Sequence, residues 1–244
     1  MLNKIYNILK NDDNIVFFGG AGVSTESGIK DFRSKDGIYN ETYKYNPETI
    51  LSHSFFYSNR LEFYKFYFDK LVIDDSIQPN KAHKFLAYLE SENKLKAVIT
   101  QNIDGLHELA ESKNIINLHG TIHENYCDKC NKFYSLDYMI NHKDNLICEC
   151  GGYIKPNVVL YEEPLDEENI NKAIKYISEA NTLIIGGTSL TVYPAAGLIR
   201  YFKGKNLIVI NKDNINSIED AIFINEPIGE FMGKLEELYV KEKN

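Results

Sequence analysis

The chain has 244 residues, enough for one large domain or one domain with a small insert, and its net charge is −8. Hydrophobic residues make up 43% and charged residues 25%, which is typical of globular proteins and excludes a disordered chain. The acidic balance argues against nucleic acid or an anionic membrane as a direct partner, and no apolar run reaches the roughly 20 residues of a membrane span. The first residues lack the apolar stretch of a signal peptide, so the expected compartment is the cytoplasm.

Short apolar runs alternate with helical patterns along most of the chain. Runs of four or five mostly β-branched residues are typical of strands that are buried on both faces of a parallel sheet. The predicted strands cover residues 14–18, 96–100, 115–118, 158–161, 182–185, 207–210 and 221–224. The helical patterns cover residues 81–91, 166–180 and 228–239. This alternation predicts an α/β domain with a doubly wound, Rossmann-like parallel sheet.

Residues 34–75 interrupt this alternation with a helical stretch that is unusually rich in aromatic side chains. They include Phe55, Phe56, Tyr57, Phe63, Tyr64, Phe66, Tyr67 and Phe68. At this spacing a helix is aromatic on nearly every side. Two interpretations stay open: the helices pack over the main sheet, or some of the rings line an apolar ligand channel.

The four cysteines all lie between positions 127 and 150. Cys127 and Cys130 form one close pair, and Cys148 and Cys150 form a second pair after a gap of 17 residues. Two close pairs at such a distance are typical of a zinc ribbon with four thiolate ligands. Disulfides and a redox dithiol are the alternatives, and a cytoplasmic setting disfavours disulfides. The sequence therefore predicts a structural zinc site, closed to water, in a small module over residues 121–155.

The residues that follow the predicted strands are rich in glycine and in small polar side chains. In an open parallel sheet the ligand binds at the carboxyl ends of the strands. The first strand leads into residues 19–28, a glycine-rich turn suited to a pyrophosphate, although Thr25 replaces a glycine of the common dinucleotide fingerprint. Later strand ends carry Gln101 to Asp104, His119, Gly187 to Ser189, and Asn211. A histidine placed there can act as a general base near neutral pH.

Five motifs in order resemble the sirtuins, which are NAD-dependent protein lysine deacylases of the Sir2 type, in their short bacterial form. The motifs cover residues 20–33, 100–107, 118–120, 155–163 and 187–196, and the cysteine pairs stand where the family carries its zinc ribbon. Two positions differ from the usual pattern: Lys30 replaces a proline and Glu162 replaces a glycine. The resemblance extends from about residue 4 to residue 238.

The resemblance implies a role for each matching residue. His119, Asn102 and Asp104 are the catalytic set, with Asp104 on the nicotinamide carboxamide, Phe32 near the nicotinamide ribose and Arg33 by the phosphates. The implied NAD-binding residues are Gly20, Ala21, Gly22, Thr25, Asp31, Phe32, Arg33, Gln101, Asn102, Ile103, Asp104, Gly187, Thr188, Ser189 and Asn211. The implied residues for the acyl-lysine peptide are Val158, Val159, Tyr161, Val192 and Tyr64. Cys127, Cys130, Cys148 and Cys150 would hold zinc.

The implied reaction consumes NAD as a co-substrate. The acyl oxygen of a modified lysine attacks the ribose carbon that carries nicotinamide, and His119 then takes a proton from the ribose hydroxyls. The products are free lysine, O-acyl-ADP-ribose and nicotinamide. Mono-ADP-ribosyl transfer from the same NAD site is the main alternative, and a regulator that only binds NAD or acyl-lysine is a second. The oligomeric state stays open, and a monomer fits the sequence.

The acyl and peptide preferences are expectations of the same kind. Relatives that prefer succinyl-lysine carry a Tyr-x-x-Arg pair, whereas this chain has Tyr64 and Tyr67, so desuccinylation is disfavoured and acetyl or longer aliphatic groups are favoured. The peptide is expected to add as a strand between residues 158–161 and the loop that contains Val192. Glu162 either attracts basic peptides to that edge or is merely solvated.

The expected domain organisation has two parts. An NAD-binding domain would comprise residues 1–33, 76–120 and 156–244, and a small domain would comprise residues 34–75 and 121–155. The catalytic cleft would lie between them, with His119 at the boundary.

Overall fold

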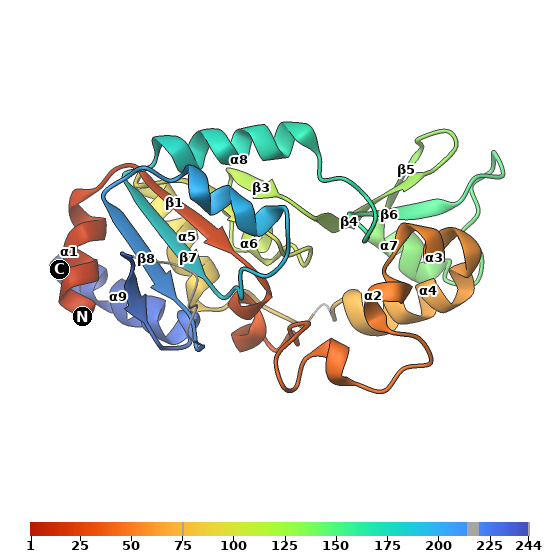
Figure 1. Ribbon diagram of the computed structural model, residues 1–244, viewed down its shortest axis with the longest axis horizontal. Coiled ribbons are helices and arrows are strands. Elements are labelled where there is room, and N and C mark those ends of the chain that lie inside the picture. The colour runs from red at the N-terminus through yellow and green to blue at the C-terminus, as the bar shows by residue number, and fades with distance from the viewer. Residues whose placement is uncertain (75, 214–219, 244) are drawn as a thin grey trace.

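The large sheet contains six parallel strands in a computed structural model that describes residues 1–74, 76–213 and 220–243. The strands are β1 (Ile15–Gly19), β2 (Leu95–Thr100), β3 (Ile115–Asn117), β7 (Thr182–Gly186), β8 (Asn206–Ile210) and β9 (Ile222–Ile224). Their order is β3-β2-β1-β7-β8-β9, so the chain reverses its direction of winding at β1 (Figure 1). This confirms the predicted doubly wound sheet and places its switch point between β1 and β7.

Helices cover both faces of this sheet and bury two separate hydrophobic cores. The helices α1 (Leu2–Asn11), α5 (Lys81–Ser91) and α9 (Ile228–Lys243) contribute to one core, which includes Phe17 of β1. The helix α8 (Glu167–Glu179) and the 3₁₀ helix η5 (Ala195–Tyr201) pack on the opposite face, against a core that includes Phe18. A short helix, α6 (Leu106–Leu109), follows β2.

Local sequence explains where the long helices begin. The side chain of Asp166 accepts a hydrogen bond from the backbone N–H of Asn169, 2.8 Å away, and acidic residues fill the first turn of α8. The Asn80 side chain caps α5 in the same manner through the N–H of Ala82, at 2.9 Å. Each cap satisfies a backbone donor that has no partner inside its helix.

A second, three-stranded antiparallel sheet holds the zinc-ribbon segment beside the large sheet (Figure 1). Its strands are β5 (Phe133–Ser135), β4 (Gly120–Cys127) and β6 (Ile154–Val158), in that order, and α7 (Leu136–Asn141) follows β5. The predicted parallel strand at 158–161 is therefore wrong, because only Val158 of that run is in a strand and this strand is antiparallel. Apolar runs predict burial, and here Val158 and Leu160 are buried in the core of the small sheet.

The aromatic-rich stretch folds onto this small sheet. It comprises α2 (Pro47–Ile50), α3 (His53–Ser58), α4 (Arg60–Phe66) and the π-helical turn η4 (Tyr67–Leu71). Phe56, Phe63 and Tyr67 are fully buried together with Ile122 of β4 and Ile154 of β6. The interpretation that these helices cover the main sheet is therefore wrong, whereas the ligand-channel interpretation stays a prediction.

Three short 3₁₀ turns complete the chain before α2: η1 (Ala21–Val23), η2 (Thr25–Ser27) and η3 (Ile38–Asn40). No helix in the described ranges is both long enough and apolar enough to cross a membrane.

Candidate active site

The glycine-rich turn after β1 packs directly against the turn after β7. The N–H of Gly22 donates to the carbonyl oxygen of Gly187 over 2.7 Å. A Cβ on Gly22 would lie 2.8 Å from the Cα of Gly187, and a Cβ on Gly187, where φ is +56°, would lie 2.2 Å from the backbone nitrogen of Val23. Only glycine fits at such distances and at such a φ. The close approach closes the switch point of the sheet, where ligands of this fold class bind.

A buried chain of polar side chains lies under this turn. The Asn102 amide donates to the hydroxyl oxygen of Ser24 over 3.0 Å, and the Ser24 hydroxyl donates to the Asp104 carboxylate over 2.7 Å. The second carboxylate oxygen of Asp104 accepts the N–H of Leu106 at 3.0 Å. Burial raises the pKa of Asp104, and the two donors oppose that shift because they favour the charged form.

Ser24 is a site residue that the sequence reasoning did not single out. Its side chain is 1% exposed, although it lies in a turn between two short helices. A serine in a glycine-rich turn is an ordinary turn residue, so the sequence carries no local signal for its role. Ser24 contacts Asn102 and Asp104 because the fold packs the turn after β1 against the turn after β2, and these contacts cannot be read from the sequence.

His119 lies at the junction of the two sheets, directly before β4. Its Nδ1 is 3.0 Å from the carbonyl oxygen of Gln101. A carbonyl only accepts, so Nδ1 carries the proton and Nε2 keeps a free electron pair. Burial lowers the pKa of His119, whereas the hydrogen bond to Gln101 raises it, and the ring is held neutral more readily than a free imidazole. A neutral, oriented imidazole is suited to accept a proton.

Two further predicted NAD residues meet across the end of β1. The side-chain amide of Gln101 donates to the carbonyl oxygen of Gly19 at 3.3 Å and to the hydroxyl of Thr188 at 3.2 Å. The Thr25 hydroxyl donates to the carbonyl oxygen of Gly22 at 3.0 Å, which ties η2 to the glycine turn. These contacts bring the strand ends β1, β2 and β7 together.

Other predicted NAD residues lie at the same sheet edge but make local contacts. Ser189 and Thr191 share a hydrogen bond of 2.8 Å, and the Asn211 amide donates to the carbonyl oxygen of Asp213 at 2.9 Å. Val192, which is predicted to contact the peptide rather than NAD, accepts the N–H of Ala196 on its carbonyl oxygen at 2.8 Å. The carbonyl oxygen of Ile103 accepts the N–H of Ile122, which connects the polar loop to β4.

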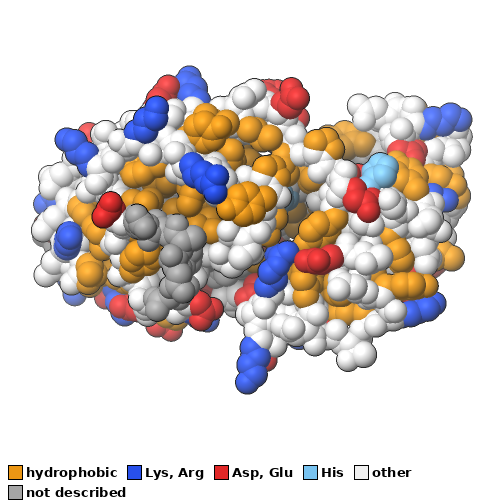
Figure 2. Space-filling view, in the orientation of Figure 1, with side chains coloured by type: hydrophobic (Ala, Val, Ile, Leu, Met, Phe, Trp, Pro, Cys, Tyr) orange, Lys and Arg blue, Asp and Glu red, His pale blue; other side chains and the backbone are white. Residues whose placement is uncertain are grey.

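The loop over residues 31–40 reaches the predicted peptide segment. The Asp31 carboxylate accepts the N–H of Arg33 at 3.1 Å and that of Ser34 at 2.7 Å, so it shapes the turn. The Phe32 ring packs edge-on against Tyr39, with centroids 5.5 Å apart. The Arg33 guanidinium donates to the Tyr161 hydroxyl at 3.0 Å. Figure 2 shows that the surface is hollowed where the large and small parts of the molecule meet.

The predicted peptide segment continues β6 and passes His119. The N–H of Val159 donates to the carbonyl oxygen of His119 at 2.9 Å, while Val158 pairs with Gly120 at the start of β4. The segment therefore lies beside His119, and its role as a peptide-binding edge stays a prediction.

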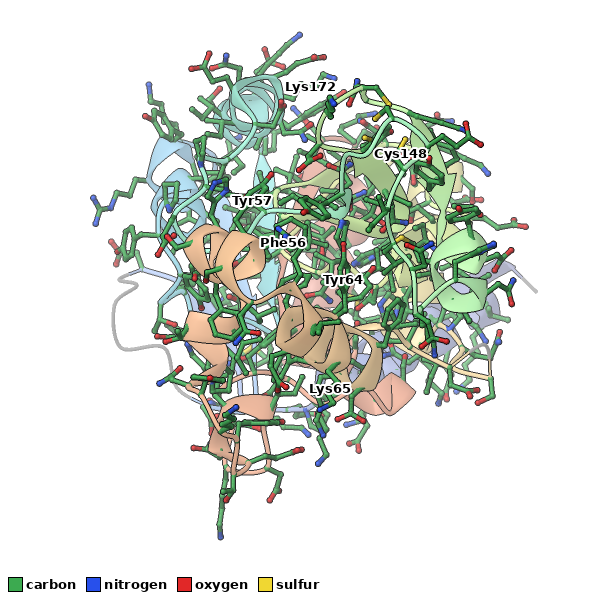
Figure 3. The ribbon with its side chains drawn as sticks, turned by 90° about the vertical axis from the view of Figure 1, so that its right-hand side faces the viewer. Phe56, Tyr57, Tyr64, Lys65, Cys148 and Lys172 are labelled. Carbon is green, nitrogen blue, oxygen red and sulfur yellow. The ribbon has the colours of Figure 1, made fainter. Side chains whose placement is uncertain are left out.

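Tyr64 occupies a different environment from the other predicted site residues. Its ring is 8% exposed in the core of the small sheet, and its hydroxyl donates to the carbonyl oxygen of Ile154 over 2.5 Å. Lys65, the next residue of α4, has a side chain that is 78% exposed and lies 3.6 Å from Glu62 (Figure 3). Within the described residues Tyr64 makes no hydrogen bond to His119, and its role at an acyl group stays a prediction.

Glu162 has a left-handed backbone conformation, with φ at +74°. Glycine adopts this conformation without strain, which is consistent with the glycine usual in the resembling family. The Glu162 carboxylate accepts the N–H of Ser54 at 2.9 Å and the Ser54 hydroxyl at 2.5 Å, and these bonds lower its pKa. The Glu162 side chain is exposed and also bonds the first turn of α3, so it is solvated and structural at once, and an attraction of basic peptides to it stays a prediction.

The four cysteines converge at one point of the small sheet. Their Sγ atoms all lie within 4.8 Å of one another, with 3.4 Å between Cys127 and Cys150 and 3.6 Å between Cys130 and Cys148. A tetrahedral zinc ion with Zn–S bonds of about 2.3 Å places its sulfurs about 3.8 Å apart. The four thiols are free rather than disulfide-bonded, and Figure 3 labels Cys148 among the sulfurs. The donor set and its spacing fit a structural zinc ion.

Known proteins resemble this chain over nearly its whole length. The family model described as "Sir2 family" matches residues 20–194. A protein of Clostridium perfringens named "NAD-dependent protein deacetylase" is 54% identical over 96% of this chain and 98% of its own length. A protein of Clostridium tetani with the same name is 53% identical over 96% of both chains.

Solved structures with a similar fold also belong to Sir2 proteins. A Sir2 variant bound to a deacetylated p53 peptide and 3′-O-acetyl-ADP-ribose has a TM-score of 0.88, with 36% identity over 97% of this chain and 98% of that chain. A Sir2 complex with a p53 peptide and NAD⁺ has a TM-score of 0.85, with 34% identity over 99% of both chains. The agreement of fold, motifs and relatives leads to one conclusion: the chain belongs to the Sir2 family.

Proposed function

We propose that this chain is an NAD-dependent protein deacetylase, which moves the acyl group of a modified lysine to ADP-ribose and releases nicotinamide. Relatives about half identical to it carry that name, and a solved Sir2 structure holds an acetylated ADP-ribose beside a deacetylated peptide. The observation that carries the proposal is the position of His119. Its Nδ1 is bonded to the carbonyl oxygen of Gln101, the residue before Asn102, and its own carbonyl oxygen accepts the N–H of Val159 in the predicted peptide segment.

The residues at the switch point fit NAD. Gly22 and Gly187 leave no side chain between the two turns, so a nucleotide can approach the main chain closely at this point. NAD supplies the ribose carbon that takes the acyl oxygen. Asp104 offers a buried carboxylate that can accept the N–H groups of a carboxamide, and Asn102 holds the hydroxyl of Ser24 in line with it.

The chain's own residues then account for the proton transfer. Nε2 of His119 accepts a proton from a ribose hydroxyl, and the Nδ1 hydrogen bond to Gln101 holds the ring in the required tautomer. Because burial lowers the pKa of His119, the base is present in its neutral form at neutral pH. The rings of Phe32 and Tyr39 lie on the loop that would exclude water from the reacting atoms.

The acyl-lysine peptide would add as a strand beside residues 158–161, with the loop around Val192 on its other side. Main-chain hydrogen bonds supply affinity in this binding mode, and they select little sequence. The net charge of −8 fits substrates that carry the basic residues common around lysines and disfavours nucleic acid. A cytoplasmic location belongs to the same proposal, because cysteines that are to hold zinc as thiolates must stay reduced. The two-part domain organisation and a monomeric state are part of the same proposal.

Product analysis tests this function. An acetyl-lysine peptide is incubated with the protein, with and without NAD, and all products are identified by mass spectrometry. Deacetylated peptide and O-acetyl-ADP-ribose, formed in equal amounts and only with NAD, are the expected products. ADP-ribosylated protein or peptide without deacetylation would instead establish the ADP-ribosyltransferase alternative.

A further inference from the structure

The hydroxyl of Tyr161 joins two segments that the proposed function assigns to different substrates. Arg33 donates to it at 3.0 Å, and the Tyr39 hydroxyl lies 2.9 Å from it. Both partners belong to the loop over residues 31–40, whereas Tyr161 belongs to the peptide segment. Glu48 completes the group, 3.2 Å from Arg33 and 3.5 Å from the Tyr161 hydroxyl.

The protons of this group can be assigned from its members. Arg33 only donates, and Glu48 only accepts when it is charged. Tyr161 can therefore accept from Arg33 and Tyr39 and donate to Glu48, so each of its hydrogen-bonding positions is used. Burial and the bond with Tyr161 raise the pKa of Tyr39, which keeps its phenol protonated and able to donate.

Backbone contacts hold Tyr161 in place independently of its hydroxyl. Its N–H donates to the carbonyl oxygen of Leu51 at 2.9 Å, and its carbonyl oxygen accepts the N–H of His53 at 3.0 Å. The next residue, Glu162, is bound to Ser54. The backbone of Tyr161 is therefore tied to the small part of the molecule, and only its hydroxyl reaches the loop over residues 31–40.

The loop that reaches this anchor forms its own compact unit. Ile38 and Tyr39 donate their N–H groups to the carbonyl oxygens of Asp31 and Phe32, at 2.8 and 2.9 Å. These bonds close the loop on itself, so its side chains at Arg33 and Tyr39 act on Tyr161 together. Residues 33–36 at the tip are exposed, and a loop with an exposed tip loses conformational entropy whenever a ligand orders it.

We propose that the Tyr161 hydroxyl is a positioning group that couples the binding of the acyl-lysine peptide to the binding of the NAD phosphates and ribose. The inference rests on the proposed function, which places NAD under the loop and the peptide beside Tyr161. A bound peptide strand restricts the motion of the Tyr161 side chain. The Tyr161 hydroxyl then keeps its hydrogen bonds to Arg33 and Tyr39, which orders the loop over residues 31–40. The nucleotide then meets a loop that is already ordered and binds more tightly, and the coupling is reciprocal.

Calorimetry with ADP-ribose, which lacks the nicotinamide leaving group, measures this coupling without turnover. In the wild type, a saturating acetyl-lysine peptide should lower the Kd of ADP-ribose by about fivefold or more. In Tyr161→Phe, which keeps the ring and the backbone bonds, the peptide should change that Kd by less than about twofold. Hydrogen exchange of residues 31–40 should slow on peptide binding in the wild type and stay unchanged in the variant.

Two further variants separate coupling from a general structural effect. Tyr201→Phe removes a phenol hydroxyl from a ring that is 47% exposed on η5 and should retain the wild-type coupling. Tyr39→Phe should weaken the coupling, and adding it to Tyr161→Phe should have no further effect, because both remove one shared bond. Equal coupling in the wild type and Tyr161→Phe, or no coupling in the wild type, would overturn the inference. Deacetylation by the wild type tests the proposed function separately, so the two can fail independently.

Discussion

Replacing Ser24 by alanine should remove the central member of the buried chain while leaving the backbone of the glycine turn intact. The Ser24 hydroxyl is 1% exposed and bridges Asn102 to the Asp104 carboxylate, which is 8% exposed. A hydrogen bond to a charged buried group contributes about 1.5 to 3 kcal/mol. If that energy supports the bound transition state, kcat/KM for an acetyl-lysine peptide should fall about 10- to 150-fold.

The pH profile gives a second readout for the same variant. The Ser24 hydroxyl favours the charged form of Asp104, so its removal raises the pKa of Asp104 further above its ordinary range. Asp104 accepts hydrogen bonds as a carboxylate, and activity that needs the carboxylate is lost as the pH falls through that pKa. The acid limb of kcat/KM should therefore move to higher pH in Ser24→Ala.

Ser27→Ala is the matched control, because it deletes a hydroxyl from the same turn. The Ser27 hydroxyl accepts a hydrogen bond from Asn80 at 3.0 Å and does not belong to the Asp104 chain. The control should keep both the wild-type kcat/KM within about threefold and the wild-type acid limb. An unchanged acid limb in Ser24→Ala, or an equal shift in Ser27→Ala, would refute the assignment of Ser24 to the carboxylate.

The remaining predictions concern the base, the metal and the acyl group. His119→Ala should lower kcat by about 10²- to 10⁴-fold, as loss of a general base does, while calorimetry shows ADP-ribose binding retained; wild-type turnover would contradict the role of Nε2. Elemental analysis should find one zinc ion for each chain, and Cys148→Ser should lower both the zinc content and the Tm, because metal binding contributes to folding of the ribbon. In an acyl-peptide panel, kcat/KM for the acetyl peptide should exceed that for the succinyl peptide by at least about tenfold. The reason is that the fully buried Tyr67 stands where an Arg would bind the succinyl carboxylate with two hydrogen bonds. Succinyl as the best substrate would refute this expectation.

Much of the fold could be predicted because its signals are local. Runs such as residues 182–185 are apolar and β-branched over their whole length, and six of the seven predicted strands are in the parallel sheet. The prediction for residues 158–161 was wrong because apolar composition indicates burial but does not indicate which strand a segment will pair with. Val158 became antiparallel because β4, which starts at Gly120, turns away from the large sheet and carries its partner with it.

The candidate site divides in the same manner. Glycines, cysteines and His119 have chemistry that is visible in the sequence, because each does something that few other residue types can do. No sequence motif points to Ser24, Tyr39 or Glu48 as individual functional residues. They matter because they contact residues that are distant in the chain. Such contacts follow from the winding of the sheet and the packing of the small part against it.

The parallel sheet, the cysteine pairs, the glycine turn and the family could all be recognised before the structure was known, since they depend on residue type and short spacing. The tertiary structure decided which side chains meet: it joined Ser24 to Asp104, set Glu162 on the first turn of α3, and brought Arg33 to Tyr161. These contacts depend on long-range packing. The bonded groups are far apart in the chain, and they come within hydrogen-bond distance only once both sheets have formed.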